Sequence, residues 1–146
     1  MIIGYAAGAF DLFHVGHLNI LRQAKSRCDY LVAGVVSDER LLLTKGRRPV
    51  IPESERLDIV SSIGFVDKAV LDFHHDRLRT WEDVGFDVFF KGDDWKGTQG
   101  GKELEELFAV VGVKVEYFPY TVHTSSTKLR VALGQLSPPP IRAQRA

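Results

Sequence analysis

The chain has 146 residues, with 19 basic and 19 acidic side chains and a single cysteine. This length fits one domain, and the balanced charge excludes the broad basic field that drives non-specific nucleic-acid binding. An internal disulfide framework is excluded, and no apolar run approaches the roughly twenty residues that span a bilayer. Because no basic leader precedes the first apolar run, we expect a soluble cytoplasmic domain over residues 1–136, with neither nucleic acid nor membrane as a partner.

Hydrophobic periodicity divides the chain into alternating strands and helices. Short, nearly continuous apolar runs are typical of strands buried in a parallel sheet, whereas apolar residues at intervals of three and four indicate helices. The basic run at 44–49 predicts a mobile loop. The pattern predicts strands at 2–7, 30–36, 67–71, 86–90 and 113–118, and helices at 18–28, from 38, and at 52–63, 76–84, 102–111 and 125–133.

This alternation predicts an α/β fold, a Rossmann-like, doubly wound, five-stranded parallel sheet. Ligands in such folds bind in the crevice at the carboxyl ends of the strands. Three glycine- or hydroxyl-rich loops fall there, at residues 8–17, 91–97 and 121–127. The dinucleotide fingerprint G-x-G-x-x-G is absent, which argues against an NAD enzyme. The proline-rich residues 137–146 predict a disordered tail.

The first loop carries two histidines at the start of a predicted helix. His14 and His17 are three residues apart, so their rings can point to one side of the helix. The first backbone N–H groups and the helix dipole favour an anion there, and Gly16 lets a ligand approach the backbone. A zinc site would need a third and a fourth ligand at suitable spacing, and Cys28 is the only cysteine. We interpret the loop as a phosphate-handling site.

The segment from Gly8 to His17 resembles the G-T-F-D-x-x-H-x-G-H signature of cytidylyltransferases, within the HxGH nucleotidyltransferase superfamily. Residues 92–97 resemble the G-D-D-W-x-G loop of glycerol-3-phosphate cytidylyltransferases, and residues 120–127 resemble the motif R-T-x-G-x-S-T-T. The resemblance extends over residues 2–133. It implies transfer of CMP from CTP to a small phosphorylated alcohol, with glycerol 3-phosphate as the leading candidate, and release of pyrophosphate. It also implies Mg²⁺ accompanying the triphosphate, and a homodimer.

The resemblance, together with the residue types, implies three groups of site residues. None of them is expected to ligate a metal directly. The expected catalytic residues are His14, His17 and Lys45. The expected nucleotide-binding residues are Gly8, Ala9, Phe10, Gly16, Asp94, Tyr120, Thr121, Ser125, Ser126 and Thr127. The expected substrate-binding residues are Asp11, Lys45, Arg47, Arg56, Arg77 and Trp95.

Four positions depart from the family pattern. Ala9 replaces a threonine, Gly64 and Tyr120 replace arginines, and His123 replaces a glycine. These departures leave open an adenylyltransferase that uses ATP, and a nucleotide-binding module without turnover. Single features also have plainer explanations: a solvated turn for the basic run, a helix cap for the hydroxyl run, and an ion-pair partner for Arg56.

Overall fold

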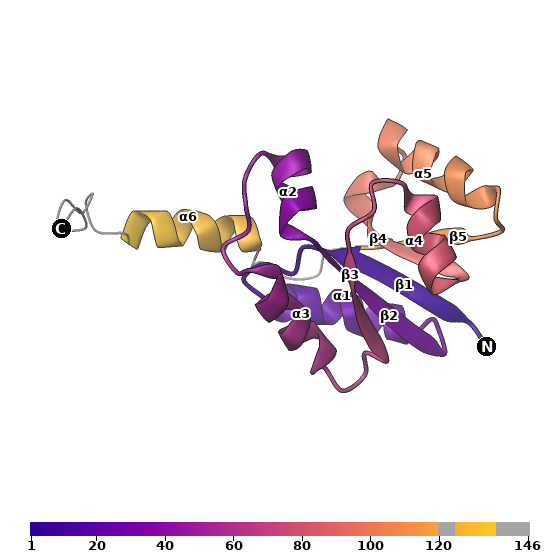
Figure 1. Cartoon of the computed structure of the whole chain (residues 1–146), viewed down its shortest axis with the longest axis horizontal. Coiled ribbons are helices and arrows are strands. Elements are labelled where there is room, and N and C mark those ends of the chain that lie inside the picture. Colours follow the sequence, from indigo (N-terminus) through magenta and orange to yellow (C-terminus); the bar gives the residue numbers. More distant parts are fainter. Residues whose placement is uncertain (120–124, 137–146) are drawn as a thin grey trace.

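The computed structural model describes residues 1–119 and 125–136, and Figure 1 shows helices on both sides of one sheet. A short 3₁₀ turn, η1, covers Asp93–Trp95. The strands are β1 (Ile3–Gly8), β2 (Tyr30–Val36), β3 (Lys68–Asp72), β4 (Val88–Gly92) and β5 (Lys114–Phe118). The helices are α1 (Val15–Lys25), α2 (Asp38–Lys45), α3 (Glu53–Ser61), α4 (Arg77–Val84), α5 (Gln99–Ala109) and α6 (Ser126–Leu136).

The sheet has the order β3-β2-β1-β4-β5, and every neighbouring pair is parallel. Strand order reverses between β1 and β4, because β1 pairs with both β2 and β4. This is the topological switch point at which open α/β sheets bind ligands, outside the carboxyl ends of the strands. The predicted Rossmann-like parallel sheet is confirmed, and the loop after β1 lies at its switch point.

Alternate residues of the central strands face two separate cores. On one face Ala6, Ala33 and Phe90 pack with residues of α1 and α3. On the other face Tyr5 and Phe89 pack with residues of α4 and α5. Strands buried on both faces read as continuous apolar runs, which is why β2 was visible in the sequence without alternation.

Local capping explains where the helices begin and end. Ser37, Asp76 and Thr98 accept backbone N–H groups at the starts of α2, α4 and α5, as small polar residues do at helix N-termini. Gly46 ends α2 in the left-handed conformation, with a φ angle of 74°. The predicted loop at 44–49 therefore needs a correction, because Lys45 belongs to the last turn of α2.

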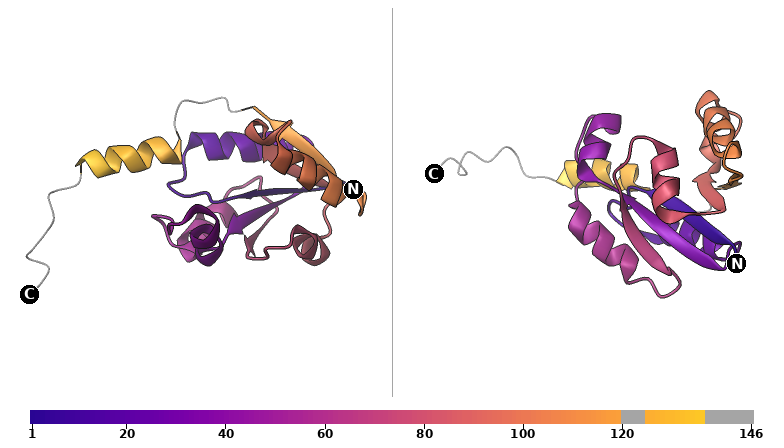
Figure 2. Two further views of the ribbon diagram at one scale, coloured as in Figure 1. Left: turned by 90° about the horizontal axis from the view of Figure 1, so that it is seen from above. Right: turned by 45° about the vertical axis from the view of Figure 1, so that its right-hand side comes forward.

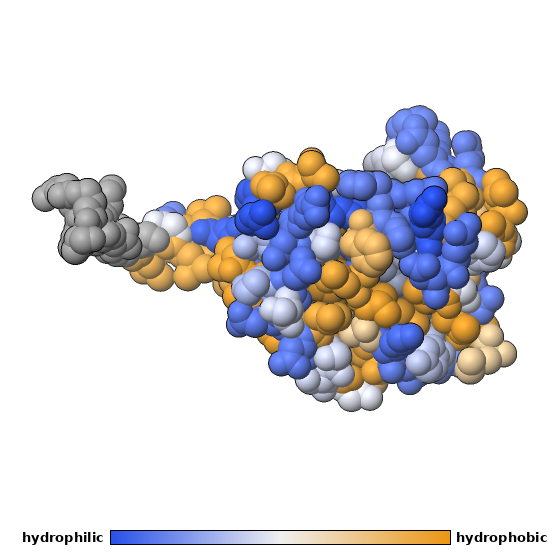
Figure 3. All heavy atoms as spheres, in the orientation of Figure 1, coloured by the Kyte–Doolittle hydropathy of each residue, from blue (hydrophilic) through white to orange (hydrophobic). Residues whose placement is uncertain are grey.

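Helix α6 projects away from the sheet, as Figure 1 and the left view of Figure 2 show. None of its residues is buried, and Val131, Leu133 and Leu136 expose apolar side chains along it (Figure 3). It starts one residue later and ends three residues later than the sequence pattern predicts. Among the described residues, no helix combines the length and the apolar character that a bilayer span requires.

Candidate active site

The loop between β1 and α1 contains two residues in an unusual backbone conformation. Phe10 and Leu12 have φ angles of 53° and 51°, in the left-handed region that side chains larger than glycine rarely adopt. Such residues cost on the order of 1–3 kcal/mol each and persist only where the surroundings fix them. Phe10 is fixed by burial, and a Cβ atom at Gly8 would lie 3.1 Å from its ring. The glycine before the loop thus makes room for Phe10.

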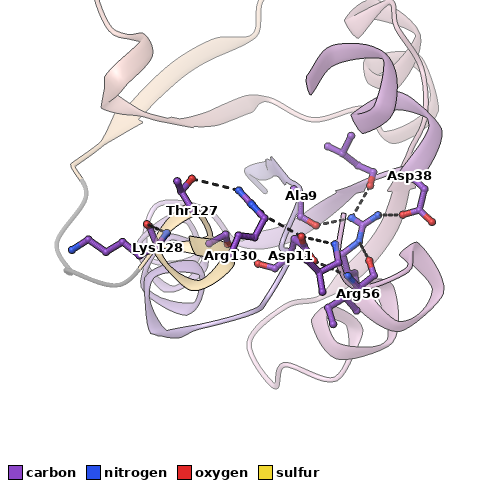
Figure 4. A network of polar contacts seen from close by, with 12 residues as sticks. Ala9, Asp11, Asp38, Arg56, Thr127, Lys128 and Arg130 are labelled. Atoms are coloured by element: carbon purple, nitrogen blue, oxygen red, sulfur yellow. Dashed lines mark hydrogen bonds and ion pairs between the residues drawn. The ribbon is translucent and has the colours of Figure 1, made fainter. Parts of the chain in front are cut away.

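Arg56 is hydrogen-bonded to the loop and to the segments beside it. Its side chain is fully buried and donates to the carbonyl oxygens of Ala9 at 2.6 Å, Val36 at 2.7 Å and Ile51 at 2.8 Å. It also forms an ion pair with Asp38 at 2.6 Å, as Figure 4 shows. A guanidinium whose donors face protein oxygens in this way is positioned to support the loop. The structure thus favours the ion-pair role that the sequence left open for Arg56.

Asp11 connects the loop to two other segments. Its carboxylate accepts the backbone N–H groups of Val50 at 2.9 Å and Ile51 at 2.8 Å, and Arg130 lies 3.4 Å from it (Figure 4). Its backbone oxygen accepts a hydrogen bond of 2.6 Å from Ser126. Because Asp11 is buried and engaged by protein donors, the geometry supports a positioning role.

The two histidines form a reciprocal cap at the start of α1. The Nδ1 atom of His14 accepts the N–H of Gly16 at 3.0 Å, and the Nδ1 atom of His17 accepts the N–H of His14 at 3.2 Å. Because a backbone amide only donates, both Nδ1 atoms are unprotonated and each neutral ring carries its proton on Nε2. The ring centroids are 4.1 Å apart. The pair therefore offers two neighbouring Nε2–H donors with a fixed tautomer.

The surroundings keep both imidazoles neutral. Burial lowers the pKa of His14 from its ordinary value. Burial, and then the charge of His14, lower the pKa of His17 to about 4, with Asp11 acting weakly in the opposite direction. At neutral pH the rings are hydrogen-bond donors without a net charge. The backbone N–H groups of His14 and Gly16 donate to the two rings and so are not available to an anion. At this helix start the Nε2–H groups of the rings take their place as donors.

The start of α6 meets the histidines although it lies more than a hundred residues away in the sequence. The Oγ atom of Ser126 is 3.4 Å from Nε2 of His17. Ser125 accepts the N–H of Lys128 at 3.0 Å, and Thr127 lies 3.4 Å from Arg130. The structure thus brings the hydroxyl run and the first loop together. Tyr120, Thr121 and His123 lie outside the described residues.

Three cations gather beside the histidine loop. Burial lowers the pKa of Lys45, and the charges of Arg130 and Arg47 lower it further, while Asp11 raises it. Lys45, an exposed residue at the end of α2, is therefore within electrostatic range of Arg47, Arg130 and Asp11. Closely spaced cations repel one another, so an anion with several charges would relieve the repulsion. The pairing of the basic run with the first loop stays a prediction, and the electrostatic effect of Asp11 on Lys45 agrees with it.

A cavity of about 290 Å³ opens beside η1. Arg77 and Trp95 line it, as do Arg40 and Lys91, which the sequence did not single out. The Nζ atom of Lys91 lies 4.1 Å from the centre of the Trp95 ring, a cation–π contact. A second cavity of about 310 Å³ lies between the β2–β3 side of the sheet and α4, and no histidine of the first loop lines it.

Lys91 connects the cavity to the histidine side. Burial lowers the pKa of Lys91 to about 8, and the charges of Arg77, Arg40 and Lys45 contribute, opposed by Asp94. Lys45 therefore lies close enough to affect a residue of the cavity. The histidine loop follows β1 and Lys91 lies near the end of β4, so both belong to the carboxyl edge of the sheet, and Lys45 acts electrostatically on Lys91 and on the loop that contains Asp11.

Four residues of this site escaped the sequence interpretation: Arg40, Asp72, Lys91 and Arg130. Each is a single charged residue within an ordinary strand or helix pattern. The available signal was their position, because Asp72 and Lys91 fall at the carboxyl ends of β3 and β4, where ligands bind. Within residues 1–119 and 125–136, no group of three or more metal-ligating side chains comes together.

The chain matches curated proteins over about two thirds of its length. Ethanolamine-phosphate cytidylyltransferase of Arabidopsis thaliana is 38% identical over 95 residues, which are 62% of this chain and 22% of that protein. The bifunctional protein HldE of Acidiphilium cryptum (strain JF-5) is 37% identical over 106 residues, which are 70% of this chain and 22% of that protein. The chain thus spans less than a quarter of the length of these two relatives.

Solved structures match the fold over most of the chain, and the sequence assigns the family. The lipopolysaccharide core biosynthesis protein from Thermoplasma volcanium GSS1 superposes with a TM-score of 0.71 at 30% identity, covering 85% of this chain and 99% of that one. Pantoate-beta-alanine ligase from Francisella tularensis has a TM-score of 0.62 at 13% identity, covering 90% of this chain and 68% of that one, and shows the shared fold alone. Residues 5–132 match the Cytidylyltransferase-like family model, and the chain belongs to that family.

Proposed function

We propose that this protein transfers CMP from CTP to the phosphate of a small phosphorylated alcohol and releases pyrophosphate, with glycerol 3-phosphate as the leading acceptor. The observation that carries the proposal is the pair of fixed Nε2–H donors of His14 and His17 beside the cluster of Lys45, Arg47 and Arg130. Family membership and the named activity of the Arabidopsis thaliana relative support the choice of reaction.

The proposed reaction needs positioning and charge stabilisation more than covalent chemistry. An oxygen of the acceptor phosphate attacks the α-phosphorus of CTP, and the bond to the β-phosphate breaks as pyrophosphate leaves. Negative charge accumulates on the phosphate oxygens in the transition state, where preorganised donors act most strongly. The neutral rings of His14 and His17 already carry a proton on Nε2, so they can donate to these oxygens without taking up a second proton. Lys45 reduces the repulsion between the two anionic substrates.

Mg²⁺ belongs to this proposal as a companion of the triphosphate. The donors that surround the site are imidazole N–H groups and cations, which suit phosphate oxygens and repel a free metal ion. Mg²⁺ usually binds substrate phosphates and keeps several of its waters, which fits this donor set. When bound, it would neutralise phosphate charge. The protein's residues would hold the phosphates of the complex.

The cavity lined by Arg40, Arg77, Lys91 and Trp95 is the proposed acceptor site. Its cations match an acceptor phosphate, and Trp95 supplies an apolar wall for the carbon skeleton. Glu103 also lines the cavity and could accept a hydrogen bond from a hydroxyl or ammonium group of the acceptor. This combination supports a phosphate monoester with a small polar body.

The test is pyrophosphate release measured with CTP, ATP, GTP and UTP against a panel of phosphorylated alcohols, including glycerol 3-phosphate and phosphoethanolamine. The proposal predicts turnover with CTP and at least one acceptor. Turnover with ATP alone would identify an adenylyltransferase. Saturable CTP binding without pyrophosphate release in the presence of any acceptor would identify a binding module.

We also propose that the protein is a homodimer, which light scattering on the same samples tests.

A further inference from the structure

Asp72 is a buried carboxylate that joins three elements of the fold. It ends β3, and its side chain is inaccessible to solvent. One oxygen accepts from Arg40 of α2 at 2.6 Å, and the other accepts from Arg77 of α4 at 2.8 Å and from the hydroxyl of Tyr5 at 2.8 Å. A buried charge requires such pairing, because an unpaired carboxylate would be strongly destabilising.

The sequence makes room for this arrangement in the centre of the sheet. A Cβ atom at Gly34 would lie 2.0 Å from the hydroxyl oxygen of Tyr5, so any larger residue there would displace the hydroxyl from Asp72. Tyr5 is itself fully buried between Phe86 and Phe89. The Tyr5 hydroxyl therefore holds the Asp72 carboxylate from within the core, and the other partners of the carboxylate are the two arginines.

The two arginines lead from Asp72 to the acceptor cavity. Arg40 and Arg77 both line it together with Lys91, and both of their charges lower the pKa of Lys91. In the described residues each arginine bonds Asp72 through a single nitrogen, and Arg77 also stacks on Phe89 at 5.5 Å. A guanidinium carries five donors, so each arginine keeps donors for a ligand.

We propose that Asp72 is a positioning residue that holds Arg40 and Arg77 as a pair of forks for an anionic group of the acceptor. The proposal rests on the proposed function of the cavity and assigns Arg40 as an anion-binding residue. One carboxylate on two guanidinium groups leaves an excess positive charge facing the cavity. The phosphate of the acceptor would supply the missing negative charge, and Asp72 would keep the two arginines from separating before it arrives.

The first experiment separates acceptor kinetics from nucleotide kinetics. Asp72→Asn keeps the shape of the side chain and removes its charge, so KM for glycerol 3-phosphate should rise about ten- to a hundredfold, the range for losing well-placed charged hydrogen bonds. KM for CTP should stay within about twofold. The matched control is Asp67→Asn, at the position just before β3 begins, which breaks the ion pair with Lys25 at 2.7 Å and should leave both KM values unchanged.

A double-mutant cycle distinguishes positioning from general structural damage. In a background of Arg40→Gln and Arg77→Gln, the Asp72→Asn change should add less than about twofold to KM for the acceptor, because the arginines it positions are gone. An equal effect in both backgrounds, or an equal rise in KM for CTP, would overturn the proposal. Arg40 is less deeply buried than Asp72, so the single change Arg40→Gln provides a second test: it should raise KM for the acceptor even if Asp72→Asn fails to fold.

A binding measurement keeps this inference separate from the proposed reaction. Trp95 lines the cavity, so glycerol 3-phosphate should change its fluorescence saturably, whereas glycerol should not, and Trp95→Phe should remove the signal. Phosphate-dependent binding that is lost in Arg40→Gln supports the inference even if no pyrophosphate is released. Normal turnover with unchanged acceptor KM in both Arg40→Gln and Asp72→Asn would refute the inference and leave the proposed function intact.

Discussion

The two ends of the site are built in different ways. The histidine end comes from a single stretch of the chain, in which His14 and His17 cap each other across one helical turn. The acceptor end is assembled from separate segments, because Arg40, Asp72 and Arg77 come from α2, β3 and α4. The difference concerns what each end must do. Two donors for one triphosphate can be fixed locally, whereas an acceptor cavity takes its walls from several elements.

The two ends also differ in charge. Burial keeps the histidine pair neutral, so it acts through fixed N–H directions. The acceptor end keeps Arg40 and Arg77 charged on a buried carboxylate. A neutral donor pair can stabilise charge that appears only in the transition state, whereas fixed cations also attract the ground-state anion. Changes at the histidine end should therefore affect kcat most, and changes at the acceptor end should affect KM most.

The largest expected effect is at the histidine end. His17→Ala should lower kcat about a hundred- to a thousandfold, the usual loss for one transition-state donor, with a smaller effect on CTP affinity. His74→Ala is the matched control, because His74 pairs with Asp83 beside the other cavity. Pyrophosphate release at saturating substrates measures the change. A His17→Ala enzyme with nearly normal kcat would remove His17 from the transition state.

Lys45→Ala should give the next largest effect, on the acceptor. Lys45 interacts electrostatically with Asp11 of the histidine loop and with Lys91 of the cavity, so its loss should raise KM for the acceptor about ten- to a hundredfold and change KM for CTP less. Lys102→Ala, on an exposed position of α5, serves as the control. If CTP affinity collapses while acceptor kinetics stay the same, Lys45 belongs to the nucleotide side.

The sequence predicted those parts of the protein whose signals are local. The five strands, their parallel arrangement and the approximate positions of the helices follow from hydrophobic periodicity. The HxGH turn could be predicted for the same reason, because its two histidines are neighbours on one helical turn. These features depend on residues within about ten positions of one another.

The remaining features depend on the tertiary structure. The left-handed conformation of Phe10 and Leu12 contradicts the preference of bulky residues and is fixed by burial and by Arg56, 46 positions from Phe10. No local pattern links Arg40 with Asp72, which approach only because β3 pairs beside β2. The extension of α2 to Lys45 was missed because the basic composition of residues 44–49 resembles a loop, whereas Gly46 sets the actual end.

The neutral histidine end should make folding stability depend on pH. The pKa of His17 lies at about 4 in the folded protein, below its ordinary value of 6.5, so the unfolded chain binds a proton more readily. This contribution to stability is complete above pH 6.5 and is lost as the pH falls toward 4, by about 1–3 kcal/mol. Urea unfolding of the protein and of His17→Gln between pH 7 and pH 4.5 measures it. Equal slopes in the two proteins would contradict the low pKa.

The smallest expected effect is a pH dependence at the acceptor end, opposite in direction to that of the histidine end. The pKa of Lys91 is lowered to about 8, so its side chain carries a positive charge below pH 8 and loses that charge as the pH rises through 8. Affinity for an acceptor phosphate should then fall about three- to tenfold between pH 7 and pH 9, since one of several cations is removed. Lys91→Arg keeps the charge across this range, and should flatten the profile of KM for the acceptor while leaving KM for CTP as it was.

Because a bound phosphate favours the charged amine, the pH midpoint of Lys91 in the complex should lie above that in the free protein. Proton uptake on acceptor binding at pH 8 should therefore disappear in Lys91→Arg. A wild-type profile that is flat between pH 7 and pH 9 would mean that Lys91 does not face the acceptor, and the charge at this end would then be that of Arg40 and Arg77 alone.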